Sequence, residues 1–294
     1  MTLDLRKLEH LVAVAEEGGF TRAAGRLHMS QQALSTSVRT LERQVGVRLL
    51  ERGHQRVVPT PAGRALVEDA RALSTQARAA LDRARRVGRD ERELLRIGHT
   101  PAVTAEEVVG LLTGARVEDH GVHTQVRQFF PDELRERLRR GELDVGLSRA
   151  MSVDPGLARA QVASHRLRLA VPSGHRLADR DQVTLADLRG ERVMVWGHPG
   201  TSGYTDLLLG LCRQAGVEPR VERNPVQGTP PLTAVVGGQH VAFVTDPAGE
   251  ALGGRVRVLD LEPTVLVPVL ALWPSRLPSP GRDLFLAHTA PERE

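Results

Sequence analysis

The segment from Phe20 to Val45 constrains this chain more than any other part of its sequence. Its pattern predicts two short helices joined by a tight turn. Thr21 is expected to cap the first helix and Ser30 the second, because a hydroxyl oxygen can accept a hydrogen bond from an unpaired N–H of the first turn. In the second helix apolar residues recur at the spacing of one buried stripe: Leu34, Val38, Leu41 and Val45.

The other face of the second helix carries side chains suited to reading duplex DNA. They are amides, hydroxyls and one guanidinium: Gln31, Gln32, Ser35, Thr36 and Arg39. Glutamine can bond adenine through two atoms, serine and threonine can bond bases or phosphates, and arginine can bond guanine or phosphate. An ordinary amphipathic helix with a solvated polar face is the alternative. The flanking segments favour DNA binding.

The segments before and after this helix pair predict a complete domain. Leu3 to Glu17 is expected to form a bracing helix, and Gly46 is expected to end the second helix of the pair. Val47 to Thr60 predicts a β-hairpin with three polar residues at or near its tip: Arg52, Gln55 and Arg56. Three helices followed by a basic hairpin indicate a winged helix-turn-helix domain, whose wing would lie against DNA phosphates.

A long helix is predicted from Pro61 to about Val87, with Thr60 as its cap. Its apolar residues keep a heptad spacing through three repeats: Leu66, Ala70, Leu73, Ala77, Ala80, Ala84 and Val87. Such a seam favours pairing with the same helix of a second copy, which suits a reader of two DNA half-sites. Packing of the helix on its own domain is the alternative. Residues 87–93 are polar and are expected to form a hinge.

Composition narrows the remaining classes of protein. Hydrophobic residues make up 40% and charged residues 26% of the 294 residues, which is typical of a globular protein with sizeable cores. Aromatic residues make up only 3%, which argues against a stacking platform for single-stranded nucleic acid. Cys212 is the only cysteine, so no intrachain disulfide can form and a small buried apolar role is expected. Because the chain shows no apolar signal core and no run long enough for a membrane helix, we expect a cytoplasmic protein.

The C-terminal two-thirds of the chain alternates between strand-like and helix-like segments. Strands are predicted over 94–99, 122–129, 142–148, 166–171, 192–196, 219–222, 240–245 and 265–273. Helices are predicted after a capping box of Thr104 and Glu107, over 131–140 and 202–214, over 230–236 with Thr229 as cap, and over 283–287. Such alternation implies mostly parallel sheets. Because the last strand and helix return to the first unit, we expect two α/β subdomains with a cleft between them.

Residues 1–65 resemble the N-terminal domain of the LysR-type transcriptional regulators. The resemblance is carried by an ordered series of segments: Leu8–Ala15, GFTRAA from Gly19, SQQALS from Ser30, Leu41-Glu42, Val45-Gly46 and TPAG from Thr60. Two positions depart from the family pattern. Leu50 stands where phenylalanine is usual and Pro59 where leucine is usual, and both belong to the predicted wing.

Residues 91–294 resemble, more loosely, the effector-binding domain of the same family, which is similar to type 2 periplasmic solute-binding proteins. The matching segments are RGELDVGL from Arg140, VPSGHRLA from Val171 and VVGGQHVAFV from Val235, whereas Thr245-Asp246 stands where proline is common. The resemblance implies a DNA-binding domain over 1–60, a linker or dimerisation helix over 61–90 and an effector-binding domain over 91–294. Its first subdomain would cover about 91–162 and 266–294, and its second about 163–265.

A ligand in an open α/β sheet gathers at strand ends and helix N-termini. These positions, together with the pocket segments that the resemblance implies, predict six effector-binding residues: Thr100, Phe130, Arg149, Thr201, Ser202 and Thr245. Hydroxyl groups could bond a carboxylate, Arg149 could add charge and Phe130 could form a wall. Structural roles are the alternative for each residue, such as helix capping by Thr100 and Ser202 or a solvent-facing position for Arg149.

The leading hypothesis is a sequence-specific regulator of transcription that binds double-stranded DNA and responds to a small-molecule co-inducer, for which an anion is one candidate. Gln31, Gln32 and Ser35 are expected to read bases. Phosphate or base contacts are expected from Thr21, Thr36, Arg39, Arg52 and Arg56, with Ser30 and Gln55 completing the DNA-binding set.

The resemblance also implies partners. These are a second copy in a homodimer, two dimers in a homotetramer, and RNA polymerase as a further candidate. The sequence shows no recognisable catalytic group, phosphate loop or pair of metal ligands, so we expect no enzyme activity, cofactor or metal. A constitutive regulator with an unused cleft and an enzyme on a solute-binding fold are the alternatives.

Overall fold

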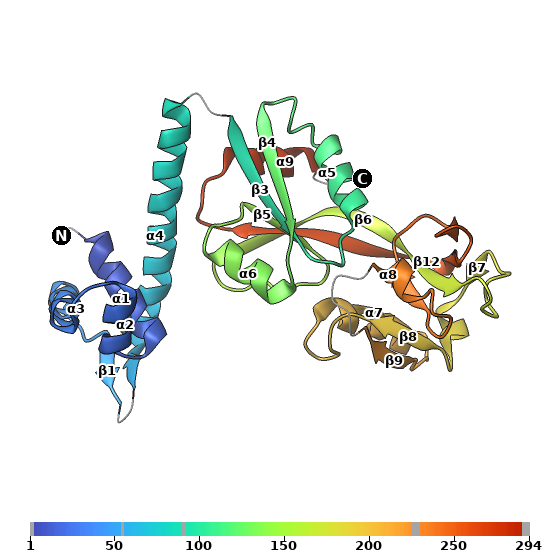
Figure 1. Ribbon diagram of the computed structural model, residues 1–294, viewed down its shortest axis with the longest axis horizontal. Helices are drawn as coiled ribbons and strands as arrows, with labels where there is room; N and C mark the ends of the chain where they lie inside the picture. The colour runs from blue at the N-terminus through green and yellow to red at the C-terminus, as the bar shows by residue number, and fades with distance from the viewer. Residues whose placement is uncertain (1–2, 54–55, 90–91, 225–229, 290–294) are drawn as a thin grey trace. The chain divides into compact units, whose positions relative to one another are not determined.

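A computed structural model describes residues 3–53, 56–89, 92–224 and 230–289. The chain divides into two compact units, one made chiefly of residues 1–92 and the other chiefly of residues 93–294 (Figure 1). Within the described residues, no helix is both long enough and apolar enough to cross a membrane.

The first unit begins with three helices and a β-hairpin. The helices are α1 (Leu5–Glu17), α2 (Phe20–Arg26) and α3 (Gln31–Val45), and the hairpin pairs β1 (Leu50–Arg52) with β2 (Val57–Pro59). Their core is a single apolar cluster that includes Leu8, Leu11, Val14, Leu34, Val38, Leu41 and Leu49. The predicted winged helix-turn-helix arrangement is therefore confirmed.

The caps of these helices confirm some predictions and correct others. The hydroxyl of Ser30 accepts a hydrogen bond from the amide of Ala33, and Gly46 ends α3 in the left-handed conformation. The prediction for Thr21 was wrong: Gly19 occupies the N-cap of α2, and Thr21 lies within the helix. Val45 is 38% exposed, so the buried stripe of α3 ends at Leu41, one turn earlier than predicted.

The wing is held to the helices by backbone contacts. Leu50 pairs with Pro59 in the hairpin, and the amide of Val57 donates to the carbonyl of Gly18. A side chain at Gly63 would place its Cβ 1.9 Å from the carbonyl oxygen of Leu49, so this close approach requires glycine. Leu50 and Pro59, where the chain departs from the family pattern, are thus accommodated in a regular two-stranded wing.

Helix α4 (Pro61–Gly88) follows, with Thr60 as its cap. The Thr60 hydroxyl accepts from the amide of Gly63 and donates to the carbonyl of Arg48. Ala70 is fully buried against the helix trio, whereas Leu73, Ala80 and Ala84 of the predicted seam are exposed. The side chain of Val87 lies outside the described residues.

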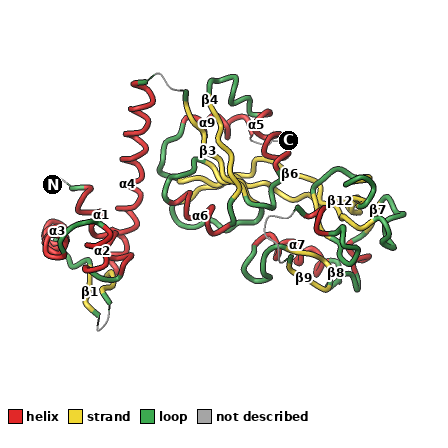
Figure 2. Tube along the Cα trace, viewed as in Figure 1, coloured by secondary structure: helices red, strands yellow, loops and turns green. Residues whose placement is uncertain are grey.

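The second unit contains a mixed sheet whose described strands follow the order β10-β6-β12-β5-β3-β4. At one end β3 (Glu93–His99) pairs in parallel with β4 (Val122–Gln128) and β5 (Val145–Ser148). Helices α5 (Ala105–Gly114) and α9 (Pro280–Thr289) share the core on one face, and α6 (Pro131–Arg139) forms a separate core with other residues (Figures 1 and 2).

The predicted dominance of parallel pairing was wrong for the centre of this sheet. Two long strands, β6 (Leu157–Pro172) and β12 (Val256–Pro274), run antiparallel through both subdomains, and β12 is also antiparallel to β5. The sequence predicted only about half of each strand, because the remaining halves carry polar residues on an exposed face. A register shift between Asp260 and Val265 interrupts their pairing.

The second subdomain is built at the far end of these two strands. It contains β7 (Gln182–Val183), the short helix η1 (Leu185–Leu188), β8 (Arg192–Val195), α7 (Gly203–Gln214), β9 (Arg220–Arg223), α8 (Pro231–Ala234), β10 (Ala242–Val244) and β11 (Gly249–Ala251). Strands β8 and β9 are parallel, and Cys212 is buried in the main apolar cluster as predicted. Helix α8 begins at Pro231 with Pro230 as its N-cap, one residue later than predicted, and the predicted cap Thr229 lies outside the described residues.

Candidate DNA interface and effector cleft

The exposed face of α3 brings together most of the predicted DNA-binding residues. Gln31, Gln32, Thr36 and Arg39 are exposed, and Ser35 is half-buried. The Thr21 hydroxyl donates to the Gln31 amide oxygen at 3.3 Å, so α2 contributes to the same surface. An exposed set of amides, hydroxyls and a guanidinium beside a helix N-terminus can bond both base edges and phosphates.

Contacts behind α3 hold this face in place. His10 on α1 is buried, and its Nδ1 lies 2.7 Å from the Ser37 hydroxyl on α3. Burial first, and then the positive charge of Arg6, lowers the pKa of His10. The neutral form of His10 is therefore favoured at this junction.

Of the wing residues predicted to bind phosphates, only Arg56 has a described side chain. Arg56 is exposed just before β2. The backbone of Arg52 belongs to β1, but its side chain and the whole of Gln55 lie outside the described residues.

The predicted effector residues of the first subdomain lie close to the ends of the parallel strands. Thr100 is 2% exposed, and its amide donates to the carbonyl of Leu147 while its hydroxyl lies 3.5 Å from that of Ser148. Phe130, which precedes α6, is 40% exposed rather than part of the core. Thr100 therefore fixes the strand ends, and Phe130 is free to contact another molecule.

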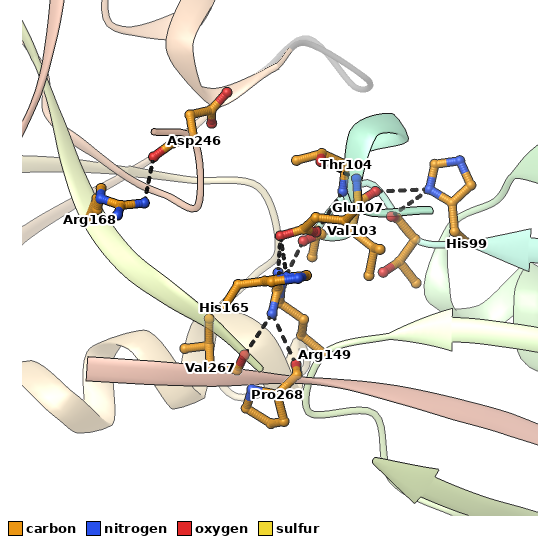
Figure 3. Close-up of polar contacts among 12 residues, drawn as sticks. His99, Val103, Thr104, Glu107, Arg149, His165, Arg168, Asp246, Val267 and Pro268 are labelled. Carbon is orange, nitrogen blue, oxygen red and sulfur yellow. Dashed lines mark hydrogen bonds and ion pairs between the residues drawn. The ribbon is translucent and has the colours of Figure 1, made fainter. Parts of the chain in front are cut away.

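Arg149 was predicted either to face a ligand or to face solvent, and the structure shows it buried. Its side chain is 0% exposed, and its guanidinium donates to three backbone carbonyls: Ala102, Val267 and Pro268. It also lies 2.6 Å from the Glu107 carboxylate (Figure 3). Its burial excludes the solvent-facing alternative, whereas its part in binding a ligand stays a prediction.

Glu107 and His165 complete a cluster around the buried Arg149 that the sequence did not reveal. One oxygen of Glu107 contacts both Arg149 and Nδ1 of His165, at 2.6 Å each, and the other accepts from the amide of Thr104 (Figure 3). The capping box itself was predicted and is confirmed. The ion pairs of Glu107 could not be predicted because their partners lie 42 and 58 residues later in the chain.

The N-terminus of α7 carries the predicted residues of the second subdomain. Ser202 caps this helix through the amide of Thr205, and the exposed Thr201 donates to the carbonyl of His198. A Cβ at Gly203 would lie 2.0 Å from the carbonyl oxygen of Ala150, so α7 directly abuts the end of β5 from the first subdomain. Burial raises the pKa of Tyr204, the next residue, to about 12.

Asp246, which the sequence places beside Thr245, lies within electrostatic range of two carboxylates at the start of α5, Glu106 and Glu107. Asp246 follows β10 next to the half-buried Thr245, and its carbonyl accepts from Arg168 (Figure 3). Burial raises the pKa of Asp246, and the negative charges of Glu106 and Glu107 raise it further, against the opposing effects of its own backbone hydrogen bond and of Arg168. The start of α5 and the loop after β10 therefore bring three carboxylates into electrostatic range of one another.

The comparisons with known proteins agree with this combination of a winged helix-turn-helix domain and a two-subdomain α/β domain. Residues 5–64 match the family model described as a bacterial regulatory helix-turn-helix protein of the lysR family, and residues 88–292 match the LysR substrate binding domain. TfdS, an HTH-type transcriptional regulator of Cupriavidus pinatubonensis, is 32% identical over 94% of this chain and 95% of its own length. YnfL, an uncharacterized HTH-type transcriptional regulator of Escherichia coli, is 35% identical over 83% of this chain and 82% of its own.

Solved structures give the same result. CbnR, a LysR family transcriptional regulator, is similar with a TM-score of 0.60 and 27% identity over 98% of this chain and 100% of the CbnR chain. Full-length CbnR complexed with its target DNA is similar with a TM-score of 0.61 and 26% identity, over 98% of this chain and 99% of the other. The fold and site thus define a DNA-binding transcriptional regulator with a substrate-binding domain.

The chain belongs to the LysR family of transcriptional regulators.

Proposed function

We propose that this regulator reads its operator with the exposed face of α3 and the residues beside it. The observation that carries the proposal is the convergence of Thr21, Gln31, Gln32, Thr36 and Arg39 on one exposed surface of a winged helix-turn-helix domain. Gln31, Gln32 and Ser35 would contact bases. The remaining members of the set would contact phosphates or bases, namely Thr21, Ser30, Thr36, Arg39, Arg52, Gln55 and Arg56.

We further propose the domain division 1–60, 61–90 and 91–294, with a homodimer formed along α4. The exposed apolar residues Leu73, Leu81 and Ala84 support an interface with a second copy. Pairing of two dimers through the C-terminal domains would give a homotetramer. The protein would act in the cytoplasm, and its contact with RNA polymerase would depend on how the bound dimers bend the DNA.

The co-inducer is proposed to bind between the two α/β subdomains. Phe130, Thr201, Ser202 and Thr245 would contact it directly, whereas Thr100 and Arg149 would shape the cleft from behind. Any anionic group of the co-inducer would be placed beside Thr201 and Ser202, since the carboxylates of Glu106, Glu107 and Asp246 gather at the start of α5 and in the loop after β10. A ligand of this kind changes regulation only if it binds one arrangement of the subdomains more tightly than another.

Genome-wide mapping of bound DNA, followed by footprinting on the recovered sites, tests the DNA-reading proposal. Gln32→Ala should change the preferred base at one position of each half-site, whereas Arg52→Gln should weaken binding to all sequences by a similar factor. Identical footprints and affinities for both variants and the parent protein would refute these assignments.

A further inference from the structure

A basic groove lies on the first unit, at the C-terminal end of α3 and the loop that follows it. We name it the arginine groove; it has a volume of about 650 Å³ and is lined by Thr36, Arg39, Glu42, Arg43, Gly46, Val47 and Arg48. Two of these residues, Thr36 and Arg39, already belong to the proposed DNA-reading face. The groove is therefore continuous with that face.

Three arginines give the arginine groove its charge. Arg39, Arg43 and Arg48 are all exposed. Within the described part of the chain, the guanidinium groups of Arg39 and Arg48 make no hydrogen bond or ion pair, and that of Arg43 donates only to the Thr40 hydroxyl at 3.0 Å. These groups retain most of their capacity to bind an anion.

The single carboxylate in the groove is already engaged by the fold. One oxygen of Glu42 accepts from the backbone amides of Leu49 and Leu50, at 2.8 and 3.2 Å. These two bonds fix the loop after α3 and direct the carboxylate toward the backbone of β1. Glu42 thus holds Arg48 at the edge of the groove instead of pairing with the arginines.

The spacing of residues along α3 indicates that the arginine groove would lie against the phosphates of a bound duplex. Gln32, Thr36, Arg39 and Arg43 follow the four-three-four spacing of one helix face. At about 1.5 Å per residue, Arg43 lies roughly 16 Å beyond Gln32 along the helix axis. The major groove of B-DNA is about 12 Å wide, so a helix with Gln32 at the bases brings Arg43 to the phosphates at the groove wall.

We propose that the arginine groove seats backbone phosphates of the operator duplex, held by Arg43 and Arg48. The inference rests on the proposed DNA-reading function and extends its footprint by one helical turn of α3 and the adjoining loop. These contacts carry no base information, so they position the reading face without selecting sequence. Each phosphate contact releases condensed counterions from the DNA.

Salt titration of operator binding by the full-length protein tests the proposal. Arg43→Gln, Arg48→Gln and the double variant are compared with Arg159→Gln, which removes the same charge from an exposed position on β6. We expect each groove variant to weaken binding about three- to tenfold at 0.1 M salt and to reduce the slope of log K against log salt by about 0.9. The double variant should lose about twice that slope, with the preferred sequence unchanged, and Arg159→Gln should match the parent protein.

Two outcomes would overturn the inference. Unchanged affinity and slope in the double variant, with circular dichroism showing an intact fold, would remove the phosphate assignment. Loss of regulation of a target promoter without any change in DNA affinity would assign the arginine groove to an acidic protein surface instead.

Gln32→Ala distinguishes this failure from failure of the DNA-reading function. If that variant changes sequence preference while the double variant binds like the parent protein, only the groove assignment is wrong. If no variant changes binding and the parent protein itself shows no sequence preference, both proposals are wrong.

Discussion

His10 makes the stability of the DNA-binding domain depend on pH. The pKa of this buried residue is lowered in the fold, whereas an unfolded histidine titrates near its ordinary value of about 6.5. Because the unfolded chain binds this proton more readily than the folded chain, the contribution of neutral His10 to the free energy of unfolding is fully present above about pH 6.5. It is lost as the pH falls from there toward the lowered value.

We therefore expect the urea concentration at the unfolding midpoint of the full-length protein to be lower at about pH 5.5 than at about pH 7.5, roughly one unit either side of 6.5. His10→Gln cannot titrate but can still bond the Ser37 hydroxyl, so it should reduce this pH dependence. An equal fall in the midpoint of both proteins would show that other groups cause it.

Gly63 is a second residue whose substitution is expected to change the stability of the DNA-binding domain. Gly63→Ala would force a Cβ against the carbonyl group of Leu49, and backbone on both sides leaves little room to move. We expect a destabilisation of about 1–3 kcal/mol, measured by urea unfolding followed by circular dichroism. Gly25→Ala is the matched control, because a Cβ there meets nothing within 4 Å and should be neutral or stabilise α2 by about 0.5–1 kcal/mol.

At the scale of elements, the contact between α7 and the end of β5 joins the two subdomains. Ala150 has a left-handed backbone with φ +52°, and the fully buried Arg149 before it anchors this turn to α5 and β12. The carbonyl of Ala150 therefore cannot retreat easily from Gly203. This contact is a steric stop for the approach of α7.

Gly203→Ala should move α7 away from β5 and open the cleft, while leaving the DNA-binding unit intact. Distance measurements between spin labels in the two subdomains should show the increase, and affinity for operator DNA in the absence of co-inducer should remain measurable. Gly210→Ala on the same helix is the control, since its nearest neighbour would be the flexible end of Arg213 at 3.9 Å. Equal label distances in both variants would contradict the steric stop.

For the whole molecule, α4 is the element that would join two copies. Leu81 is 58% exposed and Leu73 36% exposed, although both are apolar. Burying them against a second copy removes apolar surface from water, at about 25 cal/mol for each Å².

Ala80→Arg should place a charge in this seam and shift the protein toward monomer in sedimentation velocity. Binding to a full operator should weaken more than binding to a half-site, because only the full operator uses both copies. Asp82→Arg lies on the opposite face of α4 in the heptad and should leave the oligomeric state unchanged. A monomeric parent protein, or unchanged sedimentation of Ala80→Arg, would exclude the seam.

The sequence alone determined the features that depend on neighbouring residues. The caps at Ser30, Thr60 and Thr104 and the left-handed end at Gly46 form within a few residues, so their chemistry is visible in the order of the chain. The same holds for the stripe of α3, except at Val45, where the fold supplies no partner. Thr21 was misplaced because Gly19 and Thr21, two positions apart, are both residue types that can cap a helix, and Gly19 takes that position in α2.

Features made by residues far apart in the chain depended on how the molecule packs. Strands β6 and β12 pair across about a hundred residues, and Arg149 bonds the carbonyl of Val267, 118 positions later. A buried guanidinium requires such partners, but nothing local in the sequence names them. The buried contacts of Arg149 therefore emerged from packing, whereas the exposed polar face of α3 follows from the spacing of residues along one helix.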